Sequence, residues 1–117
     1  MKIAIIGSRR RNEHDDYAAV YKAFMKAYND GDTIVSGGCP KGGDKFAEII
    51  AKKNSIPILI YKADWSIGRH AGFLRNSNIA EDSNILIACV AADRKGGTED
   101  TIKKFRKFHP KGKLILV

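Results

Sequence analysis

Short runs of apolar residues alternate along the chain with longer segments in which apolar residues recur at helical spacing. The first run, Ile3-Ala4-Ile5-Ile6, is continuous and stops at Gly7, which is typical of a strand buried on both faces. The same pattern predicts five strands, at residues 3–6, 33–35, 56–60, 84–90 and 114–117. Pro57 in the third strand favours a place at the sheet edge or at the start of the strand.

Four helices are predicted between the strands. The first carries an apolar stripe at helical spacing, made of Tyr17, Val20, Tyr21, Phe24 and Tyr28. Its candidate N-caps are Asn12, Asp15 and Asp16, and Gly31 is the expected stop. The second helix begins at Asp44 and buries a stripe made of Phe46, Ala47, Ile49 and Ile50. The other two helices are expected at about 69–80 and 98–108.

Strands that alternate with helices predict an α/β fold, because right-handed crossovers between parallel strands place helices on both faces of the sheet. We therefore expect a single Rossmann-like, three-layer domain over residues 1–117, with a five-stranded parallel sheet in the order 3-2-1-4-5. No linker, internal repeat or second domain is visible in the sequence.

Composition supports this interpretation and excludes several classes of protein. The chain has 117 residues, of which 44% are hydrophobic, as in an ordinary globular domain and unlike a disordered chain. No apolar run approaches the roughly 20 residues of a membrane span, and Met1–Gly7 is too short for a signal peptide. We expect a cytoplasmic protein with no membrane partner. Two cysteines without zinc-ligand spacing predict no metal site, and we expect no bound cofactor.

The net charge of +8 is concentrated near the end of the chain. Six of the eight net charges come from a basic segment made of Lys103, Lys104, Arg106, Lys107, Lys111 and Lys113. We interpret this segment as the solvated face of the last helix, where cations also suit the helix dipole. The alternative is attraction of phosphate groups or nucleic acid.

Nine of the 11 glycines lie in four segments that follow the first four strands, at 7–9, 36–44, 64–72 and 96–100. In a parallel sheet these segments meet at the carboxyl edge, where such folds bind ligands. Glycine lets backbone N–H groups approach an anion, and two of the segments open into helix N-termini. Arg9, Arg69 and Arg75 add planar, forked cations suited to phosphate. The sequence thus predicts a phosphate- or nucleotide-sized anion site.

The ligand-binding residues predicted at this edge are Gly7, Ser8, Arg9, Ser36, Gly37, Gly38, Gly42, Asp44, Trp65, Arg69, Gly72, Arg75, Asn76, Gly96, Gly97 and Thr98. Arg69, Gly72 and Asn76 are expected to share one helix face. Simpler roles stay open for three members of the set: Asp44 as a helix cap, Arg75 in a surface salt bridge and Trp65 covering the sheet edge. Cys39 is either an activated nucleophile or a small residue that fills a tight loop.

In order along the chain, four motifs resemble the SLOG superfamily, with the YspA-like (YpsA-related) branch the most similar. They are Gly7-Ser8-Arg9, Ser36-Gly37-Gly38 through Asp44, Asp64-Trp65 with Gly68 through Asn76, and Gly97-Thr98. The resemblance implies a domain that binds a nucleotide-derived small molecule, such as one similar to ADP-ribose. It also implies a possible homodimer, since relatives often dimerise.

Two better-known relatives suggest other functions. The LOG phosphoribohydrolases cut the base from a nucleoside monophosphate with an arginine and a glutamate, and Arg75 is similar to that arginine. Thr101 stands at the glutamate position, so Asp100 or Glu99 would take over the catalytic role. The single-stranded-DNA-binding domain of DprA has a loop similar to residues 36–44. We therefore expect a nucleotide-binding domain first, an N-glycosidic hydrolase second and a single-strand nucleic-acid binder third.

Overall fold

The computed structural model describes residues 1–117 and contains a five-stranded sheet, four α-helices and one short 3-10 helix. The strands are β1 (Lys2–Gly7), β2 (Thr33–Ser36), β3 (Ile58–Ile60), β4 (Ile85–Cys89) and β5 (Lys113–Leu116). The helices are α1 (His14–Ala27), α2 (Gly43–Lys53), α3 (Ala71–Asp82) and α4 (Gly97–Phe108), with the 3-10 helix η1 at Trp65–Ile67. All neighbouring strands are parallel, in the order β3-β2-β1-β4-β5, which confirms the predicted fold and strand order.

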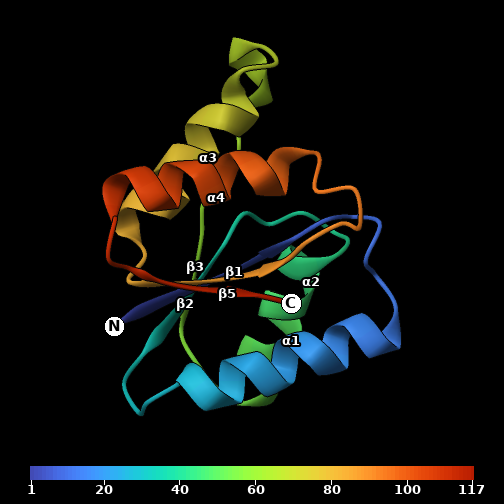
Figure 1. Cartoon of the computed structure of the whole chain (residues 1–117), viewed down its shortest axis with the longest axis vertical. Coiled ribbons are helices and arrows are strands. Elements are labelled where there is room, and N and C mark those ends of the chain that lie inside the picture. The colour runs from blue at the N-terminus through green and yellow to red at the C-terminus, as the bar shows by residue number, and fades with distance from the viewer.

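The sheet lies between two helical layers, with α1 and α2 on one face and α3 and α4 on the other (Figure 1). Strand β1 at the centre contributes to both cores because its side chains alternate between the faces. Ile3 and Ile5 pack with α1 and α2, whereas Ala4 and Ile6 pack with α3 and α4. All four are buried, as the continuous apolar run predicts.

The predicted N-caps of the first helix are wrong. Glu13, whose backbone is extended, is the N-cap, and its N–H donates to Asp16 Oδ2 at 3.1 Å. Asp16 lies three residues after this N-cap, and each of the two side chains accepts from the other residue's backbone N–H, as in a capping box. The helix ends at Ala27, and Gly31 lies in the following turn with φ of 94° rather than at the helix end.

Other elements are shorter than the sequence predicts. Ile56 and Pro57 precede β3, which confines that strand to three residues at the sheet edge. Ile49 on α2 is 39% exposed, so it lies outside the buried stripe of that helix. Helix α3 begins at Ala71 because η1 and Gly68, with φ of 113°, interrupt the backbone before it. Arg69 consequently does not share a helix face with Gly72 and Asn76.

Most of the basic segment lies on the outside of the molecule. Five of its six cations are exposed: Lys103, Arg106, Lys107, Lys111 and Lys113. Lys104 alone is partly covered, and it pairs with Asp100 four residues earlier at 2.8 Å. Among the helices, none has the length and apolar character that crossing a membrane would take.

Candidate functional site

A cavity of about 420 Å³ opens at the carboxyl ends of β1 and β4, the strands between which the sheet order reverses. We call it the carboxyl-end cavity. Twelve of the sixteen predicted ligand-binding residues line it: Gly7, Ser8, Arg9, Asp44, Trp65, Arg69, Gly72, Arg75, Asn76, Gly96, Gly97 and Thr98. The fold therefore brings together residues from all four glycine-containing segments.

Ser36, Gly37, Gly38 and Gly42 do not line the cavity. The buried Ser36 hydroxyl donates to the Asp44 carbonyl oxygen and accepts from the Gly38 N–H, both at 3.3 Å. Gly42, with φ of 75°, is pressed against the β1–α1 loop, where an added Cβ would lie 2.4 Å from Ser8 O. These residues hold the β2–α2 loop in place rather than offer groups to a ligand.

The two helix N-termini predicted to bind phosphate differ sharply. The start of α2 is closed, because an added Cβ on Gly43 would lie 2.1 Å from the Ile6 carbonyl carbon. At the start of α4, an added Cβ on Gly96 or Gly97 would meet nothing within 4 Å, and no side chain caps the helix. The α4 N-terminus therefore offers free backbone donors and its positive dipole end to the cavity.

Arg75 enters the cavity from α3 and lies over Gly37. Its Nη1 donates to Gly37 O at 2.7 Å and its Nε donates to Asn76 Oδ1 at 3.0 Å. Both acceptors are neutral and Arg75 forms no salt bridge, so the surface ion pair considered from the sequence is absent. The guanidinium is held in position without a salt bridge, which leaves it able to bind an anionic ligand.

Asn76 continues this hydrogen-bonded chain to α4. It is 7% exposed, and its Nδ2 donates to Asp100 Oδ2 at 3.1 Å and to Gly97 O at 3.4 Å. Lys104 Nζ also donates to Asp100 Oδ2, at 2.8 Å. The chain connects the β2–α2 loop, α3 and the first turn of α4, and so fixes the cavity wall.

The carboxylates predicted to be catalytic do not line the cavity. Asp100 accepts hydrogen bonds from Asn76 and Lys104, and Glu99, in the first turn of α4, accepts two hydrogen bonds from Arg94, at 2.8 and 2.9 Å. Both carboxylates lie at the positive end of the α4 dipole and form ion pairs, and these interactions explain the two acidic residues without a ligand. Of the predicted catalytic set, the cavity lining includes Arg75 alone.

Asp44 supplies the carboxylate of the cavity. It is 8% exposed, and its Oδ2 accepts from the Cys39 N–H at 3.1 Å. Burial raises the pKa of Asp44, although the Cys39 N–H and the nearby Arg75 charge both favour the anion. Gly42 rather than Asp44 is the N-cap of α2, so the helix-cap role is not the one observed.

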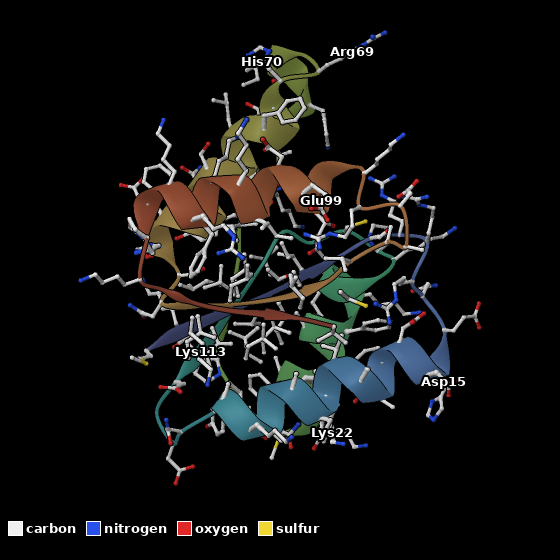
Figure 2. The ribbon with its side chains drawn as sticks, viewed as in Figure 1. Asp15, Lys22, Arg69, His70, Glu99 and Lys113 are labelled. Atoms are coloured by element: carbon white, nitrogen blue, oxygen red, sulfur yellow. The ribbon has the colours of Figure 1, made fainter.

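Cations dominate the rest of the lining: Arg9, Arg10, Arg69, Arg75 and Lys95. Arg10 is paired with Asp93 at 2.7 Å, so its charge is already compensated. Arg69 lies at the outer limit of the cavity, where its side chain extends away from the body of the domain beside His70 (Figure 2). Of the five lining cations, Arg9, Arg69, Arg75 and Lys95 form no salt bridge and are available to an anionic ligand.

Exposed aromatic side chains form the outer wall. Trp65 is 60% exposed on η1, in the segment that projects from the domain beyond α3 (Figure 1), and Phe73 is 54% exposed in the first turn of α3. An added Cβ on Gly72 would lie 3.1 Å from the Trp65 ring, so the small residue lets the indole lie close to α3. Trp65 thus contributes to the cavity instead of covering the sheet edge.

Seven lining residues were absent from the predicted ligand-binding set: Ile6, Arg10, Cys39, Phe73, Ile79, Lys95 and Thr101. Arg10, Phe73 and Lys95 directly adjoin predicted residues, so extending each motif by one residue would have included them. Ile6 and Ile79 belong to the core and carry no sequence signal for a site. No group of three His, Cys, Asp or Glu side chains could hold a metal ion.

Comparison of the chain with protein-family models, with curated proteins and with solved structures finds no match.

Proposed function

We propose that this chain binds a nucleotide-derived small molecule, such as one similar to ADP-ribose, in the carboxyl-end cavity. The observation that carries the proposal is the open α4 N-terminus beside unneutralised cations in a cavity of about 420 Å³. Ligand cavities commonly measure about 300–1,000 Å³, and helix N-termini bind phosphate through free N–H groups and the helix dipole.

The phosphate would lie against Gly96 and Gly97, within reach of Lys95 and Arg75. Open space over both glycines admits an anion to the backbone of the first turn of α4. Lys95 forms no salt bridge, and Arg75 donates to neutral oxygens only, so neither cation is engaged in an ion pair. Hydrogen bonds between charged groups contribute about 1.5–3 kcal/mol each.

The base would lie against Trp65 and Phe73. Both aromatic side chains are more than half exposed. A flat base stacked on them would remove their apolar surface from water. The Trp65 ring lies close to Gly72 at the start of α3, and Trp65 lines the cavity. An aromatic wall and a phosphate-binding helix end are the two features by which a nucleotide differs from a simple anion.

The two alternative functions have less support. An N-glycosidic hydrolase of the expected kind needs Glu99 or Asp100 at the ligand, and both side chains are engaged in ion pairs outside the cavity lining. A nucleic-acid binder would use the exposed basic segment, none of which lines the cavity. Small-ligand binding is the function that uses the residues gathered at the cavity.

Protection of Cys39 from alkylation tests the proposal. Cys39 lines the cavity and is partly exposed, whereas Cys89 is fully buried and burial raises the pKa of its thiol. Iodoacetamide should modify Cys39 more slowly with AMP or ADP-ribose present, and adenosine should protect less because it lacks phosphate. Cys89 serves as the internal control for unfolding.

A matched pair of variants on neighbouring elements separates site charge from net charge. Lys95→Ala removes a cation that lines the cavity, and Lys107→Ala removes an exposed one from the far end of α4. Calorimetry should show about a tenfold loss of AMP affinity for the first variant and less than a twofold change for the second. Equal losses, or no binding of either nucleotide to the parent, would overturn the proposal.

A further inference from the structure

We infer that Asp44 determines the specificity of the carboxyl-end cavity for ribose, so that the ligands are ribonucleotides whose hydroxyl groups donate to this carboxylate. The inference rests on the proposed function and adds the sugar to the phosphate and base already placed. It is drawn from the position, burial and charge of Asp44.

The contacts that Asp44 makes with the loop come from backbone N–H groups. Its Oδ2 accepts from Cys39 N at 3.1 Å, a bond that a neutral amide oxygen could also accept, and the Gly37 N–H likewise favours the anion. Burial raises the pKa of Asp44 despite these N–H groups, the Arg75 charge and the favourable position in the first turn of α2. A carboxylate charge at this buried position therefore costs folding free energy, which is typical of a functional position.

The surroundings indicate what the carboxylate recognises. Asp44 is the one carboxylate among the lining residues, which also include five cations. Its negative charge repels a phosphate and attracts a neutral hydrogen-bond donor. Vicinal hydroxyl groups suit a carboxylate, which can accept one hydrogen bond on each oxygen. Ribose carries such a pair at its 2′ and 3′ positions.

The depth of Asp44 favours the sugar over the base. Asp44 is 8% exposed, whereas Trp65 and Phe73, at the aromatic wall, are 60% and 54% exposed. The base fits the exposed aromatic wall and the phosphate fits the open helix end at Gly96 and Gly97. In a nucleotide the ribose joins these two groups, so we place it against the buried part of the lining, to which Asp44 belongs.

Calorimetric titration of the parent with four probes tests the inference: AMP, 2′-deoxy-AMP, 3′-deoxy-AMP and IMP. We expect AMP to bind at least tenfold more tightly than either deoxynucleotide. IMP lacks the exocyclic amine of adenine, the other donor that Asp44 could bind, and should match AMP within threefold. A loss confined to IMP, or equal binding of AMP and both deoxynucleotides, would overturn the inference.

Asp44→Asn and Asp15→Asn form a matched pair for the second part of the test. Both remove one negative charge near the start of a helix, but Asp15, on α1, is exposed and does not line the cavity. In Asp44→Asn the preference for AMP over the deoxynucleotides should fall below threefold, mainly through weaker AMP binding, and in Asp15→Asn it should be unchanged. The Asp44→Asn variant should melt no lower than the parent, because it removes a buried charge while its amide oxygen can still accept from Cys39 N.

The outcomes separate this inference from the proposed function. If AMP and its deoxy analogues bind the parent equally, the proposed nucleotide site stands and the role of Asp44 is wrong. If the Asp44→Asn variant melts normally and still discriminates tenfold, the role of Asp44 is again wrong. If neither AMP nor ADP-ribose binds the parent, the proposed function itself is overturned, and the inference with it.

Discussion

Alanine at the first residue of α2 and at the first residue of α4 should have opposite effects on stability. Gly43 and Gly97 occupy the same position in their helices, and neither has a positive φ, so backbone strain does not distinguish them. Their surroundings do. An added Cβ on Gly43 would lie 2.1 Å from the Ile6 carbonyl carbon and 2.3 Å from Gly7 N, whereas one on Gly97 would have nothing within 4 Å.

The magnitudes follow from these distances. Ordinary carbon contacts begin at 3.4 Å, so Gly43→Ala must move α2 away from the central strand by about 1.3 Å. Overpacking typically costs about 1–3 kcal/mol, and we expect about 3 kcal/mol here because the obstacle is backbone on both sides. Gly97→Ala should gain about 0.4–1 kcal/mol, since alanine loses less chain entropy on folding.

Thermal unfolding followed by circular dichroism measures both effects. A domain of this length shifts its melting temperature by about 4 °C per kcal/mol. Gly43→Ala should therefore melt about 12 °C below the parent, and Gly97→Ala about 2–4 °C above it. A Gly43→Ala variant within 3 °C of the parent would refute the close approach of α2 to β1, and a comparable fall for Gly97→Ala would refute the open α4 N-terminus.

Three further results are expected. Tyr17→Phe should raise the free energy of unfolding by about 1 kcal/mol, because the buried Tyr17 hydroxyl has no hydrogen-bond partner. In the native protein iodoacetamide should modify Cys39, and it should reach Cys89 only after unfolding. Asp82→Asn should lower the melting temperature at pH 7 but not at about pH 2. A hydrogen bond from the Lys2 ammonium lowers the pKa of Asp82, so its contribution is present above about pH 4 and is lost as the pH falls through the lowered pKa.

Two of these results have a control variant on the surface. Tyr21→Phe removes a hydroxyl that contacts Asn54 at the surface at 3.4 Å and should change stability by less than about 0.5 kcal/mol. A Tyr17→Phe variant less stable than the parent would contradict the first expectation, and equal native labelling of both thiols the second. Asp30→Asn, at an exposed aspartate without an ion pair, should have no effect at either pH, and a pH-independent loss for Asp82→Asn would contradict the third.

The strand order could be predicted because it depends on how strands and helices alternate along the chain. Continuous apolar runs such as Ile3–Ile6 fit only a strand covered on both faces, and right-handed crossovers then leave few arrangements of the sheet. Element boundaries depended on finer chemistry. Glu13, rather than an Asn or Asp, caps α1, and Gly68, with φ of 113°, delays the start of α3. Neither effect is visible in the hydrophobic periodicity of the sequence.

Which glycines face the cavity could not be predicted from composition. Gly42, Gly43 and Gly97 all stand at helix starts in glycine-rich loops, yet the first two are pressed against the backbone of residues 6–9 and the last is open. The difference lies in how closely each helix approaches β1 or its following loop, a distance that the sequence does not encode locally. The partners of Asp100 likewise come from α3 and from one turn along α4, so its withdrawal from the cavity depends on helix packing.

The central place of β1 has a consequence for how the chain folds during synthesis. Its partner β2 is only about thirty residues away, with Ile3 opposite Ile34, but its other neighbour places Ile85 opposite the same residue. A nascent chain that has not yet released β4 therefore carries an apolar central strand with one edge unpaired and one face uncovered. The second edge of β1 can be paired only after residues 85–89 have left the ribosome. Until then, the first half of the chain has only the pairing of β1 with β2 and the cover of α1 and α2 to keep its apolar residues from aggregation.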